Sequence, residues 1–353
     1  MIRENIQSLV EGISLNSQES RQAMNEIMSG SATNAQIAAF LTALRMKGET
    51  VEEIVSFAEA MREHCFMIHP HVRGRLVDTC GTGGDRLKTF NVSTATAFVV
   101  AGGGVAVAKH GNRSVTSKSG SADVLEYLGV NLDMPPEKVE NVIEQTGIGF
   151  MFAPAFHPAM KYAIKPRKEV GIRTIFNILG PLTNPASANA QLLGVYDSKL
   201  TEPVAHALKN LGCEEAIVVH GMDGLDEIST LGGTTVSRLT NGKVTSKEMQ
   251  PRDFGVKQTC IQALEGGTPE LNADILFQIV SGHCPEDDAK TEIVLVNSAA
   301  GFILGEKAEE FETGMEFALE SIRSGAAYKK LEEIIRFSGG SLEKFEELEH
   351  KYA

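Results

Sequence analysis

The stretch 76-LVDTCGTGGDRLKTFNVSTATAFVVAGGG-104 carries the pattern that decides the fold of this 353-residue chain. A short apolar run is followed by a glycine-rich loop, then by clustered hydroxyl and amide side chains, and then by an apolar run of helical type. A strand, a glycine loop and a helix in this order leave free backbone N–H groups at the start of the helix, which suits a phosphate. The stretch therefore predicts a strand-loop-helix unit with an oxygen-rich ligand at its loop.

The glycine loop GTGGD, residues 81–85, matches neither of two common phosphate-binding motifs. It lacks the GxGxxG spacing of dinucleotide-binding folds and the GxxxxGK[ST] spacing of a Walker loop. Glycine loops without a ligand are common turns, and helix capping could explain any one of Asn91, Ser93 and Thr94. Three such residues in four positions exceed what one cap requires, so we interpret the cluster as part of a ligand site.

Short apolar runs alternate with helical segments from about residue 74 onward. We expect strands at 75–80, 104–111, 148–153, 190–196 and 215–221, and helices at 92–101, 121–129, 136–146 and 201–211. This alternation predicts an α/β domain with a mainly parallel sheet and a ligand site at the carboxyl ends of its strands. The Asn241-Gly242 pair predicts a β-hairpin within 236–249.

The first seventy residues predict helices only. Thr33 with Gln36 and Thr50 with Glu53 have the spacing of capping boxes, which mark the starts of helices. The segment 165-KPRKEVGIRTIFNILGPLTNP-185 also looks helical with a proline-rich exit, and we expect it to pack against the N-terminal helices. The chain is thus expected to form a small all-helical domain hinged to a larger α/β domain.

Three histidines, His64, His69 and His71, follow the N-terminal helices and could hold a metal ion. Apart from Cys65, no cysteine or acid with ligand spacing joins them, so a helix end and linker is the favoured interpretation. Cys80, beside the glycine loop, could be a nucleophile, but we interpret it as a small buried residue at a strand end.

The composition excludes several classes of protein. The 42% hydrophobic and 22% charged residues are ordinary for a globular chain, and the net charge of −13 argues against a general nucleic-acid or anionic-membrane surface. The five dispersed cysteines without a CxxC pair indicate reduced thiols. The N-terminus does not resemble a targeting signal, and the longest apolar stretch, 97–108, is too short to span a bilayer. We expect a soluble cytoplasmic protein.

Two further motifs follow predicted strands and so fall on the same sheet edge. The stretch 109-KHGNRSVTSKSGSAD-123 interleaves bases with hydroxyls, which fits a polyanion such as pyrophosphate better than a solvated loop. The stretch 220-HGMDGLDEIS-229 offers Asp223, Asp226 and Glu227, hard oxygen ligands of the kind Mg²⁺ uses beside substrate phosphates. Either could be an ordinary surface turn, but together with the glycine loop they predict a site for a Mg-bound diphosphate.

These motifs, in the order DTCGTGGD, NVST, KHGNRSVTS, KPRKEVGIRTIFNILGPLTNP and HGMDGLDEIS, resemble those of the anthranilate phosphoribosyltransferase family, within the nucleoside-phosphorylase-like phosphoribosyltransferases. The resemblance runs over nearly the whole chain. It implies transfer of the phosphoribosyl group from 5-phosphoribosyl 1-pyrophosphate to the amine of anthranilate. The products would be N-(5-phosphoribosyl)anthranilate and pyrophosphate, in the second committed step of tryptophan biosynthesis.

The resemblance also implies an architecture and a site. A helical domain formed by 1–70 with 165–190 would mediate a homodimer, and 71–164 with 191–353 would bind phosphoribosyl pyrophosphate. Anthranilate would contact Gly81, Asn112 and Arg167, and Mg²⁺, as two ions, would be held by Ser93, Asp226 and Glu227. The residues implied for the phosphoribosyl pyrophosphate site are Gly81, Gly84, Asp85, Thr89, Asn91, Val92, Ser93, Thr94, Lys109, His110, Gly111, Asn112, Arg113, Ser114, Val115, Thr116, Ser117 and Ser121.

The residue types make such chemistry intelligible without a catalytic base or nucleophile. Displacement at the anomeric carbon leaves negative charge on pyrophosphate, which Mg²⁺ and a basic loop would stabilise. The aromatic amine is already a nucleophile at neutral pH, so positioning can suffice. We therefore expect no catalytic residue in the strict sense.

Two other functions remain open at this point. A pyrimidine nucleoside phosphorylase shares the fold and a phosphate loop but uses inorganic phosphate, and the tandem Asp226-Glu227 with the KHGNR loop favours a metal-bound diphosphate. A non-enzymatic relative that binds nucleic acid would need a basic groove, which the net charge of −13 opposes.

Overall fold

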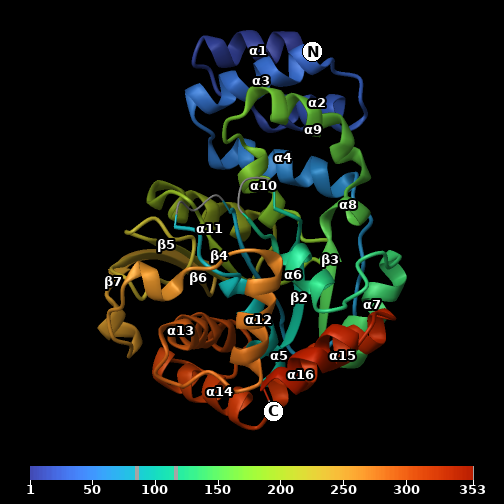
Figure 1. Ribbon diagram of the computed structural model, residues 1–353. Coiled ribbons are helices and arrows are strands. Elements are labelled where there is room, and N and C mark those ends of the chain that lie inside the picture. Colours follow the sequence, from blue (N-terminus) through green and yellow to red (C-terminus); the bar gives the residue numbers. More distant parts are fainter. Residues whose placement is uncertain (84–86, 115–117, 353) are drawn as a thin grey trace.

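The computed structural model describes residues 1–83, 87–114 and 118–352. Figure 1 shows a helical bundle that contains the N-terminus, stacked on a larger part built around a sheet. The bundle is formed by the helices α1 (Ile2–Val10), α2 (Ser17–Met28), α3 (Asn34–Lys47) and α4 (Val51–Glu63). Two later helices, α9 (Lys161–Val170) and α10 (Phe176–Leu182), pack on α2, α3 and α4. The expected placement of the segment 165–185 against the N-terminal helices is therefore confirmed.

Capping boxes begin two of the bundle helices where the sequence predicted them. The Thr33 hydroxyl accepts a hydrogen bond from the Gln36 backbone N–H, and the Gln36 side chain accepts one from the Thr33 N–H. Thr50 and Glu53 form the same pair at the start of α4. These bonds satisfy N–H groups that a helix leaves unpaired at its start.

The larger part is built on a seven-stranded sheet with the order β3-β2-β1-β4-β5-β6-β7. Strands β1 to β5 pair in parallel, and β6 joins β5 in antiparallel orientation. The strands are β1 (Leu76–Gly81), β2 (Ala106–Gly111), β3 (Ile148–Phe152), β4 (Ala190–Gly194), β5 (Glu215–Gly221), β6 (Thr234–Thr240) and β7 (Lys243–Met249). Each of the five strands expected from the alternating pattern is present.

The expected hairpin is formed by β6 and β7. Asn241 and Gly242 join them, both with positive φ, 49° and 70°. Two-residue hairpin turns of this hand require positive φ at both positions, which Asn and Gly adopt at low cost.

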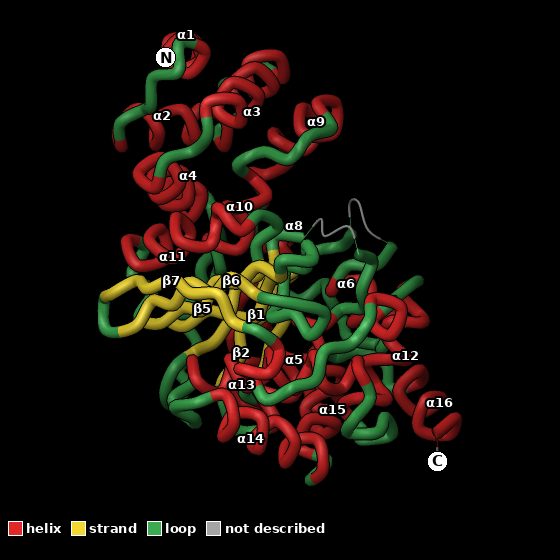
Figure 2. The backbone as a smooth tube through the Cα atoms, turned by 90° about the vertical axis from the view of Figure 1, so that its left-hand side faces the viewer, coloured by secondary structure: helices red, strands yellow, loops and turns green. Residues whose placement is uncertain are grey.

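Helices cover both faces of the sheet, as Figure 2 shows with α11 on one side of the strands and α5 and α13 on the other. The remaining helices are α5 (Val92–Gly102), α6 (Ser121–Tyr127), α7 (Pro136–Thr146), α8 (Ala153–Phe156), α11 (Thr201–Asn210), α12 (Pro269–Val280), α13 (Ala289–Leu304), α14 (Phe311–Arg323), α15 (Ala326–Ser338) and α16 (Glu343–Tyr352). Short 3₁₀ turns occur at η1 (Pro158–Met160), η2 (Ser198–Leu200), η3 (Pro251–Phe254) and η4 (Ile261–Leu264). No helix in the described part of the chain is long and apolar enough to cross a membrane.

Neighbouring residues of the central strands point to opposite sides of the sheet and enter two different apolar cores. Leu192 and Ile217 belong to the core under α5 and α13. Leu193 and Val218 belong to the core under α11, which continues without a break into the helical bundle. Because both faces are covered, these strands are apolar on both sides, which explains why their sequences are continuous apolar runs.

Candidate functional site

The three predicted ligand loops leave the same edge of the sheet. Gly81 ends β1, Gly111 ends β2 and Gly221 ends β5, so the loops that follow them share the carboxyl edge. In open parallel sheets this edge is where ligands bind. A hydrogen bond joins two of the loops directly: the Gly83 backbone N–H donates to Asp226 Oδ2 at 2.8 Å.

Two strands must end in glycine for the acidic loop to lie across this edge. A Cβ atom on Gly81 would stand 2.4 Å from Asp226 Oδ2, and one on Gly194 would stand 1.5 Å from the Asp226 carbonyl oxygen. Neither distance is possible for a real side chain. The glycines at the ends of β1 and β4 therefore allow Asp226 to reach the glycine loop.

In the acidic loop, residues 220–229, Asp223 stabilises the turn, whereas Asp226 and Glu227 belong to the predicted metal site. Asp223 holds the turn, because it accepts hydrogen bonds from the Leu225 N–H and the Ser229 hydroxyl. Burial raises the pKa of the Asp226 carboxyl group, and the Gly83 N–H, His220 and Arg173 partly offset this rise. Glu227 beside it is buried. A desolvated carboxylate at the sheet edge is a suitable ligand for a divalent cation.

Lys109 lies beneath the glycine loop and faces Ser93. Its Nζ donates to the Thr79 carbonyl oxygen at 2.5 Å and to Ser93 Oγ at 3.2 Å. Lys109 is 3% exposed, and burial lowers the pKa of its ammonium group. The nearby carboxylates of Asp78 and Glu227 act in the opposite direction. The structure thus brings the three predicted metal ligands, Ser93, Asp226 and Glu227, around the glycine loop and Lys109.

Asp78 is a site-supporting residue that the sequence reasoning missed. It is completely buried, and its carboxylate accepts hydrogen bonds from Asn184 Nδ2 at 2.8 Å, Gln191 Nε2 at 3.2 Å and the His110 backbone N–H at 3.3 Å. Backbone pairing between β1 and β2 covers only Leu76–Val77, so the Asp78 side chain takes over where these strands separate. An acid inside the apolar run LVDTC was the signal that could have revealed it.

Asn91 stands at the N-cap of α5 but does not cap it. In the described part of the chain its side chain makes no capping hydrogen bond to α5. The amide oxygen instead accepts from Asn272 Nδ2 at 2.9 Å, and Nδ2 donates to the Ser119 carbonyl oxygen at 3.4 Å. Helix capping, the simple alternative for Asn91, is therefore wrong.

The other predicted residues of this turn have varied environments. Thr94 Oγ1 is buried and has no hydrogen-bond partner among the residues described. Val92 is buried among apolar side chains, so only its backbone could face a ligand. Thr89 forms an isolated β-bridge with Glu265, from a loop far along the chain.

The basic loop is partly neutralised by acids of α6. The Arg113 guanidinium makes two hydrogen bonds to the Glu126 carboxylate, at 2.5 and 2.7 Å, and a third to Asp123 Oδ1 at 3.3 Å. It also lies 5.4 Å from the centre of the Phe152 ring. These partners raise the pKa of Arg113 and occupy the side chain that the sequence assigned to a diphosphate.

The remaining members of this loop stay close to the strand end. Ser121 Oγ donates to the Asn112 carbonyl oxygen at 3.5 Å, and a Cβ on Gly111 would lie 2.3 Å from Ser121 Oγ. The Ser114 N–H donates to Asp123 Oδ2 at 3.0 Å. Five predicted site residues lie outside the described residues: Gly84, Asp85, Val115, Thr116 and Ser117.

Arg167 lies in the last turn of α9 and differs from its lysine neighbours. Lys165 and Lys168 are exposed, whereas Arg167 is half-buried with its guanidinium 5.1 Å from the centre of the Phe176 ring. Burial lowers the pKa of Arg167. Within the described ranges it has no carboxylate partner, so a partly desolvated guanidinium is left without a counter-charge.

His110 lies beside His157, with ring centres 5.1 Å apart. Burial lowers the pKa of His110 to about 3 and that of His157 to about 4, so both imidazoles are neutral at pH 7. His110 Nε2 has no hydrogen-bond partner in the described part of the chain.

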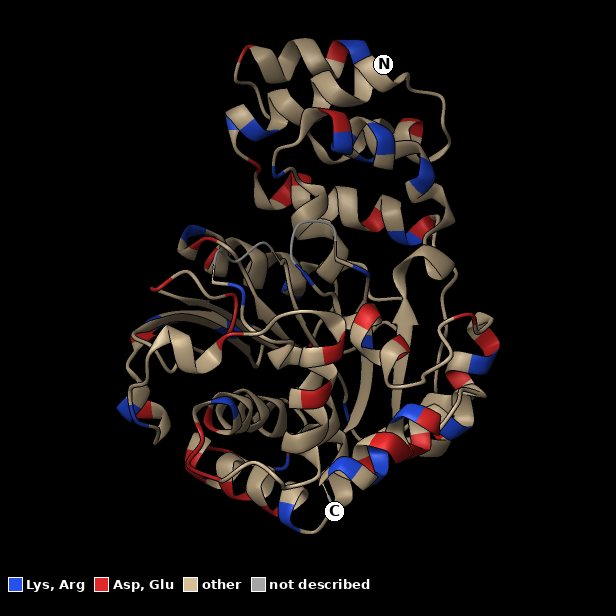
Figure 3. Ribbon diagram, viewed as in Figure 1, with Lys and Arg blue, Asp and Glu red and all other residues tan. Residues whose placement is uncertain are grey.

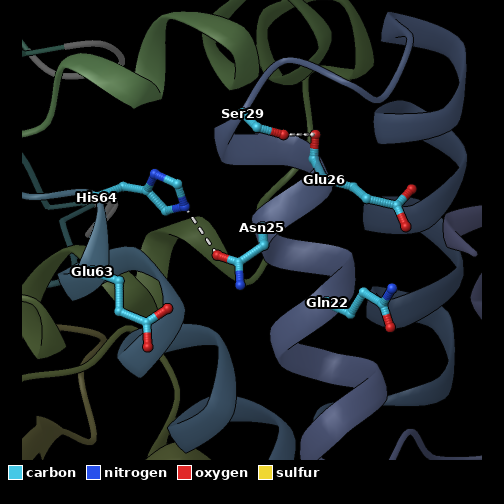
Figure 4. Close-up of a pocket in the computed structure, with 6 residues that line it drawn as sticks. All are labelled: Gln22, Asn25, Glu26, Ser29, Glu63 and His64. Carbon is cyan, nitrogen blue, oxygen red and sulfur yellow. Dashed lines mark hydrogen bonds between the residues drawn. The ribbon is translucent and has the colours of Figure 1, made fainter.

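His64 belongs to a different surface region. As Figure 4 shows, it lines a pocket of about 470 Å³ with Gln22, Asn25, Glu26, Ser29 and Glu63. Its Nε2 lies 2.9 Å from Asn25 Oδ1, and the residue forms the C-cap of α4. Among the described residues no group of three or more His, Cys, Asp or Glu side chains is placed to hold a metal ion.

The sequence also raised the role of the Cys80 thiol and the distribution of charge on the surface. Cys80 is buried in β1, as expected, and burial raises the pKa of its thiol. Figure 3 shows acidic and basic residues interspersed along α15 and α16, with no continuous basic band on these helices.

Comparisons with known proteins agree on one family. The helical bundle domain of the glycosyl transferase family matches residues 3–65, and its a/b domain matches residues 73–328. The chain is 53% identical over 340 residues to the anthranilate phosphoribosyltransferase of Methanocorpusculum labreanum, covering 96% of this chain and 99% of that protein. It is 53% identical over 338 residues to the enzyme of Acetivibrio thermocellus, covering 96% and 97%.

Solved structures give the same result. The anthranilate phosphoribosyltransferase of Thermus thermophilus superposes with a TM-score of 0.88 at 40% identity, covering 95% of this chain and 99% of that one. The enzyme of Saccharomyces cerevisiae in complex with PRPP and Mg superposes with a TM-score of 0.87 at 30% identity, covering 96% and 98%. The same yeast enzyme in complex with 4-fluoroanthranilate gives a TM-score of 0.86 at 30% identity, again covering 96% and 98%.

Proposed function

The chain belongs to the anthranilate phosphoribosyltransferases of the glycosyl transferase family, and from this membership we propose that it joins anthranilate to 5-phosphoribosyl 1-pyrophosphate (PRPP). The products are N-(5-phosphoribosyl)anthranilate and pyrophosphate, and the reaction is the second committed step of tryptophan biosynthesis. The observation that carries this proposal is the hydrogen bond between the glycine loop and the acidic loop, from Gly83 N–H to Asp226 Oδ2. It supports the proposal, because it joins a carboxylate that could bind a metal to the loop that precedes α5.

The chain's residues fit Mg²⁺ held jointly with a substrate. Asp226 is desolvated, and Glu227 and Ser93 lie around the same lysine, Lys109. Two carboxylates and a hydroxyl leave coordination positions for phosphate oxygens and water, which is how Mg²⁺ is usually held beside phosphates. Ser93, Asp226 and Glu227 would hold Mg²⁺, as two ions, and the metal would neutralise charge that develops on the leaving pyrophosphate.

The protein's own groups orient the two reactants. Backbone N–H groups of the glycine loop and of the first turn of α5 would bind phosphate oxygens, and Lys109 supplies positive charge from below. Arg167 would hold the anthranilate carboxylate through its planar pair of N–H groups, with Gly81 and Asn112 as neighbours. The amine of anthranilate needs no base, since positioning against the anomeric carbon supplies the main advantage.

Arg113 has a role that depends on its acidic partners. Glu126 and Asp123 hold its side chain, so any contact with a diphosphate would require it to exchange these partners. We therefore assign the electrostatic role of this loop chiefly to Lys109 and to the backbone N–H groups of Gly111 and Asn112.

The architecture completes the proposal. We propose a helical domain of residues 1–70 with 165–190, an α/β domain of residues 71–164 with 191–353, a homodimer formed through the helical domain, and a cytoplasmic location. The packing of α9 and α10 on the N-terminal helices supports this division.

A substrate-pair assay tests the proposed function. The purified protein is given either anthranilate with PRPP or a pyrimidine nucleoside with inorganic phosphate, each with Mg²⁺. We expect pyrophosphate and phosphoribosylanthranilate, identified by mass spectrometry, from the first pair alone. Release of free base from the nucleoside, with no pyrophosphate from the first pair, would instead indicate a nucleoside phosphorylase.

A further inference from the structure

A loop far along the chain lies against residues 88–90, which precede α5. It connects η4 to α12 and contains Gly266 and Gly267. The Gly266 N–H donates to the Lys88 carbonyl oxygen at 3.0 Å, and Glu265 forms a β-bridge with Thr89. A Cβ atom on Gly266 would stand 2.6 Å from the backbone of Phe90, so the approach requires glycine. This loop is therefore built to touch the segment that leads into α5.

Asn272, in the first turns of α12, connects this loop to Asn91. It is 2% exposed. Its Oδ1 accepts a hydrogen bond from the Gly267 N–H at 2.7 Å, and its Nδ2 donates to Asn91 Oδ1 at 2.9 Å. Asn91 Nδ2 in turn donates to the Ser119 carbonyl oxygen at 3.4 Å. Three hydrogen bonds thus connect the Gly267 N–H, through the amides of Asn272 and Asn91, to Ser119 in the basic stretch 109–123, here called the KHGNR loop.

The two ends of this chain fix the orientation of both amides. The Gly267 N–H can only donate, so Asn272 must present its oxygen there and its NH₂ group to Asn91. The Ser119 carbonyl can only accept, so Asn91 must present its NH₂ group there and its oxygen to Asn272. Each amide has one orientation that satisfies both partners, and the two orientations agree.

Asn91 links two segments of the proposed PRPP site. Asn91 is the N-cap residue of α5, but its side chain is hydrogen-bonded to Asn272 and Ser119. Among the described residues it therefore makes no capping hydrogen bond to α5. The same amide ties the start of α5 to the far end of the KHGNR loop. Both segments belong to the proposed PRPP site, whereas Asn272 comes from an element to which that site assigns no residue.

We propose that Asn272 is a positioning residue for the diphosphate site: it locks Asn91 in the orientation that holds the start of α5 and the Ser119 end of the KHGNR loop together. The proposal rests on the proposed function, since it concerns binding of PRPP. Asn272 itself touches Asn91 and the Gly267 backbone, and it acts through Asn91.

The test is Asn272→Asp, which keeps the size of the side chain. The aspartate still accepts from the Gly267 N–H but places a carboxylate oxygen against Asn91 Oδ1, so the link to Asn91 is lost or Asn91 turns and loses Ser119. We expect the KM for PRPP and the Kd for Mg-pyrophosphate, measured by calorimetry, to rise at least about tenfold. The KM for anthranilate should change less than about twofold.

Asn131→Asp is the matched control. The Asn131 amide also donates to a distant backbone carbonyl, that of Ser338, but lies in the connection between α6 and α7, away from the proposed site. We expect it to lower thermal stability without changing the KM for PRPP. Asn91→Asp, which keeps the acceptor for Asn272 but loses the Ser119 link, should raise the KM for PRPP.

The outcomes separate this inference from the proposed function. An inactive wild-type protein with no affinity for Mg-pyrophosphate would remove the proposed function and the inference with it. An active wild type whose Asn272→Asp variant matches Asn131→Asp in the KM for PRPP would overturn the inference alone. Asn272→Ser, too short to reach Asn91, covers the case in which the aspartate unfolds the chain; if both variants unfold, Asn272 is structural and the inference is wrong.

Discussion

Arg167 is a half-buried cationic residue in the last turn of α9. Its guanidinium is partly desolvated, lies against Phe176 and has no carboxylate partner within the described ranges, whereas Lys165 and Lys168 on the same helix are exposed. Arg167→Ala should weaken anthranilate use by roughly 1.5–3 kcal/mol, the range for a hydrogen bond to a charged group. Steady-state kinetics with each substrate varied in turn should show a loss in kcat/KM for anthranilate and little change in the KM for PRPP.

Lys168→Ala, one residue along, is the control for Arg167 and should leave both constants unchanged. If Arg167→Ala behaved like Lys168→Ala, Arg167 would be only a packing residue against Phe176.

Asp226 and Glu227 should confer the dependence on Mg²⁺. Replacing both with Ala should abolish turnover at ordinary Mg²⁺ concentrations, because Asp226 lies beside the Gly83 N–H and Glu227 lies near Lys109, which donates to Ser93. Circular dichroism should show an intact fold. Unchanged turnover of the double variant, or full wild-type activity in EDTA, would rule out the metal assignment.

His110 and His157 should make the folded state sensitive to acid. Their folded-state pKa values of about 3 and about 4 lie below the usual value of about 6.5, because burial disfavours the charged imidazole. Below pH 6.5 the unfolded chain takes up protons that the folded chain does not, so stability is full above this pH and falls as the pH decreases toward 4. At pH 5 each histidine should cost about 2 kcal/mol.

Urea unfolding between pH 7 and pH 5 measures this effect. His157→Gln should reduce the loss of stability over that interval, whereas His206→Gln, an exposed histidine beside Glu202, should not. Equal pH slopes for the wild type and His157→Gln would contradict the assignment.

At the scale of elements, the ends of the strands position the site. A Cβ on Gly194 would lie 1.5 Å from the Asp226 carbonyl oxygen, so Gly194→Ala must push the acidic loop away from β4. We expect the affinity for Mg-pyrophosphate to fall at least about tenfold, with a loss of stability of roughly 1–3 kcal/mol from overpacking. Gly232→Ala is the control, since the nearest atom to its Cβ is 3.7 Å away. Calorimetry with both variants should show the loss of affinity only for Gly194→Ala.

The sequence predicted most elements because their signals are local. Apolar runs bounded by glycine located the five parallel strands, Asn241-Gly242 located the hairpin, and the two capping boxes located the starts of α3 and α4. The antiparallel pairing of β6 with β5 was not predicted, since it depends on which sheet edge is left uncovered. Asp78 and Asn272 were missed because the partners that link them to the site, Asn184 and His110 for Asp78 and Asn91 for Asn272, are more than 30 residues away along the chain.

The site, too, could be predicted only where the signals are local in the sequence. Residue types after strands correctly predicted that the glycine loop and Asp226 would meet. They could not reveal that Lys109 is buried beneath the loop or that Arg113 is held by Glu126, because local sequence does not show which acids face a base.

At the scale of the whole molecule, the helical bundle packs against the larger part and also carries exposed apolar side chains. Its core continues through α11 to one face of the sheet, so the two proposed domains share apolar contacts. Many of the large apolar side chains that remain exposed belong to the bundle, among them Val10, Ile13, Met46 and Ile164. Exposed apolar side chains that gather on one part of a molecule often mark an interface.

The proposed homodimer follows from this exposure. Light scattering should give twice the chain mass of 38.0 kDa. Met46→Glu with Ile164→Glu should shift the mass toward the monomer if the bundle forms the interface, whereas Phe337→Glu, at an exposed position of α15, should not. A monomeric wild type would contradict the proposed dimer and leave the proposed reaction untouched.

The proposed transfer reaction is tested most directly by the fluorescence of anthranilate. The protein is mixed with anthranilate, PRPP and Mg²⁺, and the decay of fluorescence is followed as the amine is consumed. We expect a decay that requires protein, PRPP and Mg²⁺ together, stops on addition of EDTA and yields one pyrophosphate for each anthranilate lost. Stable fluorescence with all components present and the fold intact would contradict the proposed function.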